Sequence, residues 1–453
     1  MVKLFGTDGI RGRYGIYPIT PSSMLQLGWC VGTVCREQNP RLSKVLIGRD
    51  TRISGHVIES AITSGLLSAG LDVSILGPVP TPAVSYFCRS SDAIAGVVIS
   101  ASHNPAHDNG VKLINSDGSK ASDQFQCSIE RMMQQPLAIS NTVKLGKFTR
   151  IEDAVDQYSS YLCSTADTSL QGLRIVVDCA NGASYRIAPK VLTALGANVI
   201  SVGVNPDGYN INHQCGSTNP EFIQQQTIDH AADVGIALDG DGDRVVMADR
   251  QGNLLNGDQL LFVIAMARKR DNRLAGGVVG TLMSNIGLER ALSDQGIPFE
   301  RTDVGDRYIS ERLMQLGWNL GGEESGHILN GETGAPGDGI AAVLEVLREI
   351  KNTGRSLHQL VEGIQLVPQV TVNVRLQNRT APLSQLDLRQ WPQIGQALEE
   401  AELKLNYCGR VLLRASGTEP IIRVLVEGDQ DKNIEEIANN VADAVREESH
   451  LNS

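Results

Sequence analysis

The sequence predicts an α/β protein that ends in a smaller α+β domain. Short apolar runs of strand length end in polar loops, and apolar-periodic helices separate these strands. This strand–loop–helix order recurs three times before residue 368, in units of roughly 100 to 150 residues, as a weak internal repeat of elements. The remaining residues instead alternate apolar and polar side chains and form a strand pair with two helices.

The composition is that of an ordinary globular protein. The chain has 453 residues, 41% of them hydrophobic and 20% charged, with a formal net charge of -11. No run of five or six basic residues occurs, so we expect no nucleic-acid partner. No apolar run approaches the ~18 residues of a membrane span, so we expect no membrane partner either.

Eight cysteines are scattered along the chain, and none forms a C-x-x-C pair. The first residues, MVKLFGTDGIRG, turn glycine-rich at once and do not resemble a signal peptide. Reduced, mostly buried thiols in a cytoplasmic protein fit this pattern best.

The first domain is predicted over residues 1–153. Its opening stretch, Phe5 to Gly12, combines three glycines with Arg11, which could approach an anion or form a tight turn. The expected helices begin at Pro21 and His56. The expected strands are 44–47, 73–76 and 93–99. A rigid proline-rich connection, 77–82, follows the second of them.

A hydroxyl and an imidazole follow the strand 93–99. Ser102, His103, Asn104 and Pro105 come where Pro105 stops the ladder, at the carboxyl end of a strand, where ligands bind in open α/β sheets. Ser102 could be a nucleophile or phosphate carrier, or it could only cap a turn. Lys112, ten residues on, is either its charge partner or a solvated lysine.

The second domain is predicted over 154–255 and carries three alternating aspartates. Asp239, Asp241 and Asp243 lie between the expected strands 234–238 and 245–248, next to Arg244. Converging carboxylates repel one another and require a cation, and hard oxygen ligands suit Mg²⁺. An EF-hand is excluded because Arg244 and Arg250 replace its glycine and glutamate. A solvated acidic turn is the alternative.

The third domain is predicted over 256–367. After a glycine pair, Glu323, Ser325 and His327 alternate and could bind sugar hydroxyls, with His327 able to move protons, or could form a polar turn. The expected helices are 260–268, 286–295 and 339–351, and the expected strands are 277–281 and 299–302.

The fourth domain is predicted over 368–453. Its expected strands are 369–376, 410–414 and 421–426, with helices 394–405 and 433–446. The turn between the last two strands concentrates donors that could form a phosphate pocket, or else an exposed hairpin. These residues are Arg414, Ser416, Gly417, Thr418 and Arg423.

Four loops in this order resemble the α-D-phosphohexomutase superfamily over essentially the whole chain. They are SHNP from Ser102, DGDGDR from Asp239, GGEESGH ending at His327 and RASGTEP ending at Pro420. The opening FGTDGIRG, the segment DCANGA and the segment VGDRY, which contains Asp306 and Arg307, are most similar to the bacterial phosphoglucosamine mutase family. The resemblance implies four domains around a central cleft, which corrects an estimate of three domains from length alone.

The resemblance also implies roles for these residues. Ser102 would be the phosphoserine intermediate, and its phosphate would join the three aspartates around Mg²⁺. Charge stabilisation and proton transfer would fall to Arg11, His103, Lys112, Arg244 and His327. Substrate binding would fall to Asp306, Arg307, Glu323 and Ser325, and phosphate binding to the Arg414–Arg423 turn.

The implied reaction interconverts glucosamine 6-phosphate and glucosamine 1-phosphate, on the route to UDP-N-acetylglucosamine and peptidoglycan precursors. Glucosamine 1,6-bisphosphate, or another hexose 1,6-bisphosphate, would prime the enzyme, which would be a monomer or homodimer. A phosphomannomutase or phosphoglucomutase of the same superfamily, or a non-catalytic sugar-phosphate-binding relative, remains the alternative.

Overall fold

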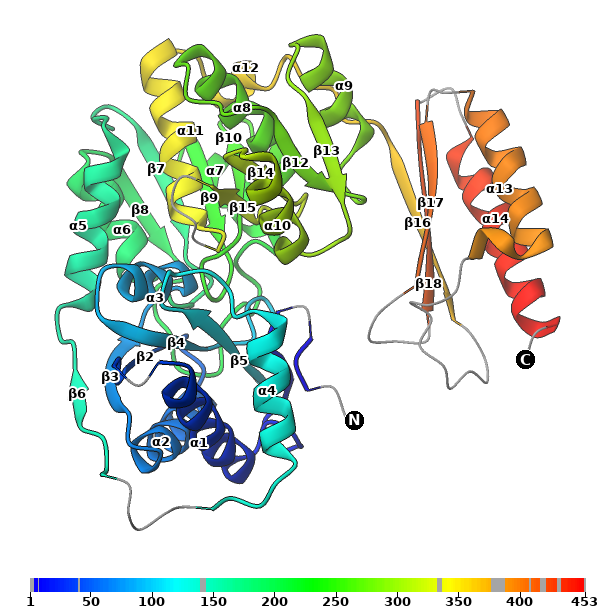
Figure 1. Ribbon diagram of the computed structural model, residues 1–453. Coiled ribbons are helices and arrows are strands. Elements are labelled where there is room, and N and C mark those ends of the chain that lie inside the picture. Colours follow the sequence, from blue (N-terminus) through cyan, green and yellow to red (C-terminus); the bar gives the residue numbers. More distant parts are fainter. Residues whose placement is uncertain are drawn as a thin grey trace. The chain divides into compact units, whose positions relative to one another are not determined.

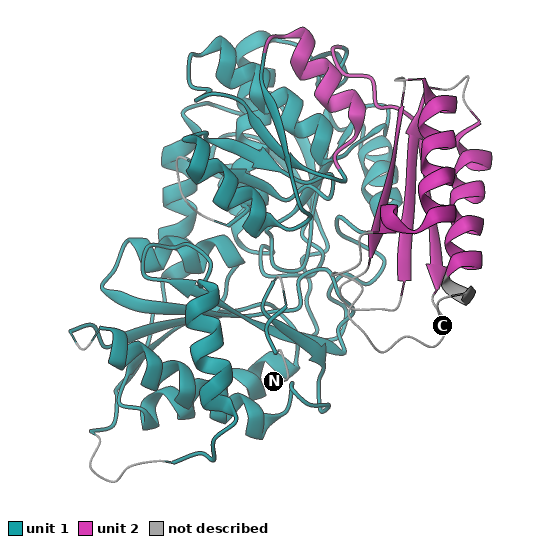
Figure 2. Ribbon diagram, turned by 45° about the vertical axis from the view of Figure 1, so that its right-hand side comes forward, with its two compact units in different colours: residues 1–283, 297–362 teal, residues 284–296, 363–453 magenta. Residues whose placement is uncertain are grey.

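The computed structural model describes residues 4–6, 8–39, 41–138, 144–331, 336–375, 388–406, 409–415, 421–429 and 433–451. Figure 1 shows the chain coloured along its sequence. It divides into two compact units, drawn in different colours in Figure 2. Unit 1 comprises Met1–Met283 and Ile297–Glu362, and unit 2 comprises Ser284–Gly296 and Gly363–Ser453.

The first sheet of unit 1 is mixed. Its strand order is β1-β5-β4-β2-β3-β6, in which β1, β5 and β4 pair antiparallel and the other neighbours pair parallel. The strands are β1 (Ile10–Arg13), β2 (Lys44–Arg49), β3 (Asp72–Pro78), β4 (Ala93–Ile99), β5 (Asp108–Asn115) and β6 (Phe148–Arg150). The helices are α1 (Pro21–Gln38), α2 (Ser54–Ser68), α3 (Thr81–Arg89) and α4 (Asp123–Met133). Figure 1 shows α1, α2 and α4 over one face of this sheet and α3 over the other.

Helices α1 and α2 pack closely through glycines. A Cβ on Gly28 would lie 2.3 Å from the carbonyl oxygen of Ile62, and one on Gly65 would lie 2.2 Å from that of Leu25. Larger side chains at either position would therefore force the two helices apart.

Unit 1 contains two further sheets. The second has the order β11-β10-β9-β7-β8 and the third β13-β12-β14-β15. Their strands are β7 (Arg174–Asp178), β8 (Asn198–Val202), β9 (Val234–Leu238), β10 (Val245–Asp249), β11 (Leu254–Leu255), β12 (Val278–Thr281), β13 (Phe299–Thr302), β14 (Leu320–Gly322) and β15 (Ile328–Asn330). Their helices are α5 (Ala154–Ala166), α6 (Ile187–Ala194), α7 (Pro220–Asp229), α8 (Gly257–Arg270), α10 (Asp306–Leu316), α11 (Gly339–Thr353) and α12 (Leu357–Leu360).

Unit 2 is built on an antiparallel sheet of order β16-β18-β17. The strands are β16 (Gln369–Arg375), β17 (Gly409–Ala415) and β18 (Ile421–Gly428). Its helices are α9 (Ile286–Asp294), α13 (Pro392–Leu405), α14 (Ile434–Leu451) and the 3₁₀ helix η2 (Leu388–Gln390). Apolar side chains of α13 and α14 form a core with the sheet, including Ile394, Leu398 and Val441. Helix α9 joins this unit because the side chain of Asn285, at its N-cap, bonds the main chain of Val367.

The predicted class of three α/β sheet layers and an α+β domain agrees with this arrangement. One local expectation is wrong: the proline-rich connection ends at Pro80, and Thr81 begins helix α3 with Pro82 in its first turn. Proline is well suited to the first turn because its missing N–H would have no helical partner there. Within the described residues, no helix is both long and apolar enough to span a bilayer.

Candidate functional site

Ser102 lies in the tight connection between β4 and β5 and is fully buried. Its Oγ donates to Asp239 Oδ2 at 2.6 Å and lies 3.4 Å from Nδ1 of His103. Its backbone N–H donates to Oγ of Ser100 at 2.9 Å. The hydroxyl therefore points from the first sheet directly at a carboxylate of the second.

The three predicted aspartates converge at the end of β9. Asp239, Asp241 and Asp243 are all buried, and one oxygen from each lies within 4.8 Å of the others. Oδ1 of Asp241 and Oδ1 of Asp243 are buried and have no hydrogen-bond partner among the described residues. Thr81, at the start of α3, donates from Oγ1 to Asp241 Oδ2 at 2.7 Å. A hard cation would satisfy these carboxylate oxygens.

Lys112 supplies positive charge to the same cluster. It projects from β5 and is 3% exposed. Its Nζ lies 2.9 Å from Asp241 Oδ2, 3.0 Å from Asp243 Oδ2 and 3.0 Å from Asp8 Oδ2. Burial alone would lower the pKa of Lys112, but these carboxylates, with Asp241 foremost, raise it well above its ordinary value. Lys112 is therefore a charge partner of the site and not a solvated lysine.

His327 connects the cluster to the third sheet. Its Nδ1 lies 3.5 Å from Asp243 Oδ1 and its Nε2 lies 3.1 Å from Asp306 Oδ2. Burial opposes protonation of His327, but Asp243 and Asp306 outweigh it and raise its pKa to about 10. Asp306 also pairs with Lys120, which pairs in turn with Asp8. Alternating charges thus link all three sheets of unit 1.

The surroundings shift the pKa values of Asp239 and His103 upwards and downwards, respectively. Burial raises the pKa of Asp239 well above its usual range, and the charges of Asp243 and Asp241 raise it further. Burial lowers the pKa of His103 to about 4, with Arg244 and Arg11 acting in the same direction. A neutral imidazole therefore stands beside the Ser102 hydroxyl at neutral pH.

Two predicted arginines border the cluster. Arg11, on β1, pairs with Asp8. Arg244 donates its backbone N–H to Asp239 Oδ1 at 3.1 Å, and its Nε lies 4.0 Å from Asp243 Oδ1.

The predicted sugar-binding residues are less uniform in their placement. Glu323 follows β14 and accepts the backbone N–H of Gly305 at 3.1 Å. Ser325 has a buried Oγ with no hydrogen-bond partner among the described residues. Arg307 is paired with Asp123 and, at 2.8 Å, with Glu311. Arg307 is thus engaged by acidic side chains, whereas its neighbour Asp306 belongs to the charged network.

The predicted phosphate turn belongs to unit 2. Arg414 and Arg423 are directly opposite each other on β17 and β18. Arg414 is half-buried and Arg423 is exposed. The rest of this turn, Ser416, Gly417 and Thr418, lies outside the described residues.

Models of the phosphoglucomutase/phosphomannomutase domains match the chain in order. The alpha/beta/alpha domains I, II and III match residues 2–138, 155–252 and 256–367, and the C-terminal domain matches residues 372–444. The chain belongs to the phosphoglucomutase/phosphomannomutase family. The predicted superfamily and its four-domain architecture are thereby confirmed.

Curated family members match along nearly their full length. The phosphoglucosamine mutase of Serratia proteamaculans is 50% identical over 446 residues, covering 98% of this chain and 98% of that protein. Phosphoglucosamine mutase 1 of Shewanella amazonensis is 49% identical with the same coverage.

Solved structures of the family share the fold. A phosphoglucomutase/phosphomannomutase family protein from Burkholderia thailandensis has a TM-score of 0.81 at 22% identity, covering 98% of this chain and 97% of the other. The Aspergillus fumigatus N-acetylphosphoglucosamine mutase, in complex with GlcNAc-6P and magnesium, has a TM-score of 0.71 at 18% identity, covering 99% and 96%.

Sequence reasoning missed several residues that the structure brings to the site. Asp8, Lys120 and Thr81 contact predicted members of the cluster, and Arg52 and Asn212 bond the main chain of the Ser102 loop. Asp8 had a signal, because it lies in the same glycine-rich stretch as Arg11. The other four are single polar residues outside any recognisable motif, and they give none.

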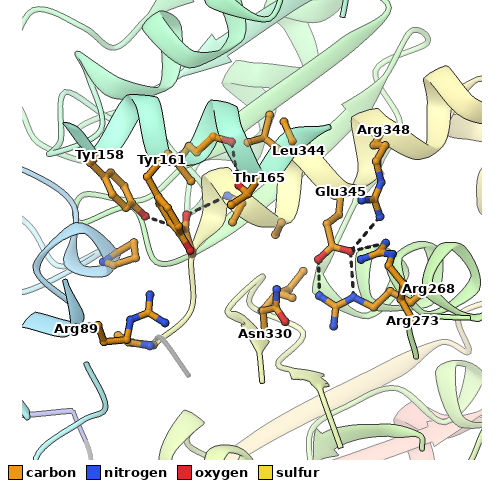
Figure 3. Close-up of a pocket in the computed structure, with 18 residues that line it drawn as sticks. Arg89, Tyr158, Tyr161, Thr165, Arg268, Arg273, Asn330, Leu344, Glu345 and Arg348 are labelled. Carbon is orange, nitrogen blue, oxygen red and sulfur yellow. Dashed lines mark hydrogen bonds and ion pairs between the residues drawn. The ribbon is translucent and has the colours of Figure 1, made fainter. Parts of the chain in front are cut away.

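A pocket of about 140 Å³ lies between α5 and α11, away from Ser102 and the aspartate cluster (Figure 3). Tyr158 and Tyr161 line one wall, and Glu345 at the other end faces Arg268, Arg273 and Arg348. None of the predicted site residues lines this pocket. It is therefore not the candidate site of the reaction.

Proposed function

We propose that this enzyme interconverts glucosamine 6-phosphate and glucosamine 1-phosphate, with Ser102 carrying the phosphoryl group. The observation that supports this most strongly is the 2.6 Å hydrogen bond from the buried Ser102 hydroxyl to Asp239, inside a cluster of three carboxylates and Lys112. The full-length identity of about half to proteins named phosphoglucosamine mutase supports the amino-sugar substrate.

The proposed reaction has two phosphoryl transfers. The hydroxyl at carbon 1 of glucosamine 6-phosphate attacks the phosphorus on Ser102, the bond from phosphorus to Oγ breaks, and the attacking hydroxyl loses its proton. The resulting 1,6-bisphosphate turns end for end. Ser102 Oγ then loses its proton and attacks the phosphorus at carbon 6, the bond from that phosphorus to the oxygen on carbon 6 breaks, and this oxygen takes up a proton. The step regenerates phosphoserine and releases glucosamine 1-phosphate. Such transfers depend mainly on positioning and charge stabilisation.

The aspartate cluster fits Mg²⁺. It offers three oxygens within 4.8 Å, and Asp241 and Asp243 each have a buried oxygen with no described hydrogen-bond donor. Asp239, Asp241 and Asp243 would hold the ion together with the phosphate on Ser102. When bound, Mg²⁺ would neutralise charge on the transferring phosphoryl oxygens.

The remaining residues receive roles from their placement. Lys112 and Arg244 border the carboxylates and would stabilise negative charge on the phosphoryl group, together with Arg11 and His327. His103, beside the hydroxyl, would take up or deliver a proton.

Substrate contacts fall to the third and fourth domains. Glu323 and Ser325 would bind sugar hydroxyls, and Asp306 and Arg307 would also take part in substrate binding. The turn of Arg414, Ser416, Gly417, Thr418 and Arg423 would bind the phosphate that is not reacting.

We further propose four domains over residues 1–153, 154–255, 256–367 and 368–453, a monomer or homodimer, and priming by a hexose 1,6-bisphosphate. A cytoplasmic location accords with the free thiols of all described cysteines.

The test compares kcat/KM for glucosamine 6-phosphate, mannose 1-phosphate and glucose 1-phosphate, each with Mg²⁺ and a trace of the matching 1,6-bisphosphate. We expect a preference of ~100-fold or more for glucosamine, equivalent to ~3 kcal/mol of transition-state binding. Comparable or reversed rates would transfer the assignment to a phosphomannomutase or phosphoglucomutase. Turnover with none of them, by enzyme shown to carry phosphate, would favour a sugar-phosphate-binding protein.

A further inference from the structure

The backbone of the Ser102 loop is bonded by two side chains from different sheets. Nη2 of Arg52 donates to the carbonyl oxygens of Ser102 and Asn104 at 2.9 and 2.7 Å. Nδ2 of Asn212 donates to the same two oxygens at 2.9 and 3.1 Å. Arg52 lies between β2 and α2 beside the first sheet, whereas Asn212 lies in the connection from β8 to α7 of the second. We call these two residues the loop clamp.

Arg52 is itself fixed in place. Its side chain is completely buried, and its Nε donates to Asp50 Oδ2 at 2.8 Å. Its Nη1 donates to the carbonyl oxygens of Pro105 and Asp108. Asp50 also accepts the hydroxyl of Ser100 at 2.6 Å. A buried guanidinium with this many partners has one orientation, so it presents its donors at fixed positions.

The loop needs such support because Ser102 has an unfavourable backbone conformation. Its φ is +52°, in the left-handed region, which costs a residue with a Cβ about 1–2 kcal/mol. This conformation accompanies the hydrogen bond from Ser102 Oγ to Asp239. Hydrogen bonds to the carbonyls of Ser102 and Asn104 hold the loop in this conformation without touching the hydroxyl itself.

The loop clamp also packs against the loop that carries the three aspartates. A Cβ on Gly240 would lie 2.6 Å from the carbonyl oxygen of Ser102 and 2.8 Å from Nδ2 of Asn212. The glycine between Asp239 and Asp241 is therefore where the second sheet approaches the clamped carbonyl. Loop, clamp and carboxylates thus form one packed assembly.

We propose that Arg52 and Asn212 are positioning residues. They hold Ser102 at the position relative to the aspartate cluster that phosphoryl transfer requires. Asn212 fixes this position between the two sheets, because its side chain extends from the domain that carries the aspartates to the loop that carries Ser102. This inference rests on the proposed role of Ser102 as phosphoryl carrier. Both side chains bond the carbonyl oxygens of Ser102 and Asn104, and the described partners of Ser102 Oγ are instead Asp239 and His103.

The central test removes the side-chain amide of Asn212 without straining the backbone at this position. Asn212→Gly suits the native φ of +57°, and Gln214→Gly, at a φ of +54° in the same connection, is the matched control because Gln214 is exposed and outside the clamp. Each variant is phosphorylated with glucose 1,6-bisphosphate, and mass spectrometry gives the phosphorylated fraction. Loss of phosphate from Ser102 after addition of glucosamine 6-phosphate is then followed in a single turnover.

We expect Asn212→Gly to slow transfer, per phosphorylated enzyme, by roughly 10- to 100-fold with KM changed by less than about 3-fold, since small misplacements of reacting groups cost up to ~100-fold. Gln214→Gly should stay within about 2-fold of the wild type. A merely structural role would lower the melting temperature or the phosphorylated fraction and leave the normalised rate unchanged, and that result would overturn the inference. Should Asn212→Gly not fold, Asn212→Asp keeps the shape, replaces the donor by an acceptor, and is expected to lose at least as much.

The second test asks whether the two side chains act on the same carbonyls. Arg52→Lys keeps the charge but removes the planar fork of donors. In the double variant with Asn212→Gly both carbonyls lose donors, so the rate loss should exceed the product of the two single losses. A loss equal to that product would refute the shared clamp. A wild-type enzyme whose Ser102 accepts no phosphate would instead refute the proposed function, so the two failures are distinguishable.

Discussion

Removing the charge of Lys112 provides a quantitative test of the aspartate cluster. We predict that Lys112→Met lowers the free energy of unfolding of unit 1 by about 3–5 kcal/mol when Mg²⁺ is withheld. Lys112 is 3% exposed and faces three carboxylates at 2.9–3.0 Å. One such pair is worth ~5 kcal/mol at an effective dielectric of ~20, before the cost of burying the charges is subtracted. Measured losses for broken buried pairs of this kind are about 3–5 kcal/mol.

The matched control is Lys190→Met. Lys190 pairs with Asp156 at the surface, where the two side chains are 48% and 64% exposed. Exposed pairs contribute at most about 1 kcal/mol, so this variant should be close to the wild type.

The assay is urea unfolding of wild type and both variants, with and without Mg²⁺. Because Lys112→Met leaves the cluster more negative, Mg²⁺ should stabilise that variant more than it stabilises the wild type. A Lys112→Met loss below about 1 kcal/mol, equal to that of the control, would refute the reasoning that Lys112 compensates the aspartates.

Three further predictions concern other parts of the fold. Burial raises the pKa of Asp178 to about 6, so the folded protein favours its protonated form below pH 6. The stability this gives is complete below pH ~3.8 and is lost as pH rises through 6. Between pH 4 and 7 the wild type should therefore lose ~2 kcal/mol relative to Asp178→Asn in urea titrations, and parallel pH profiles would contradict this. Alkylation of the native protein at pH 7.5, mapped by mass spectrometry, should modify exposed Cys127 and spare Cys30, Cys35 and Cys88. Burial raises the pKa of each of these three thiols to about 12, so they stay protonated. Rapid modification of Cys30 would show that this core opens. Gly65→Ala should destabilise unit 1 by about 1–3 kcal/mol in urea unfolding because its Cβ would meet the carbonyl of Leu25, whereas Ser64→Ala on the exposed face should be nearly neutral, and equal effects would argue against the close helix contact.

Much of the fold could be predicted because its strands are short apolar runs that stop at polar loops. Strand β4 was expected at 93–99 and β9 at 234–238, and both have these bounds. Helix α3 was missed because Pro80 and Pro82 resemble helix breakers, although proline in a first turn favours a helix start. Such a proline cannot be interpreted without knowing where the chain turns.

The site was predictable where one motif holds several chemical groups, as in the aspartates 239, 241 and 243. It was not predictable where a single polar side chain meets the main chain of a distant segment. Arg52 and Asn212 bond the carbonyl of Ser102 over separations of 50 and 110 residues. A carbonyl acceptor leaves no trace in the residue type, so only the folded chain reveals these contacts.

The measurement that tests the central claim most directly is the exchange of phosphate at Ser102. Purified enzyme is incubated with glucose 1,6-bisphosphate and Mg²⁺, freed of the reagent, and analysed by peptide mass spectrometry before and after addition of glucosamine 6-phosphate. We predict one phosphoryl group on the peptide containing Ser102, its loss to the sugar on addition of glucosamine 6-phosphate, and neither event in Ser102→Ala, which should still bind the sugar phosphate. Phosphate on another residue, or undiminished turnover by Ser102→Ala, would contradict the account.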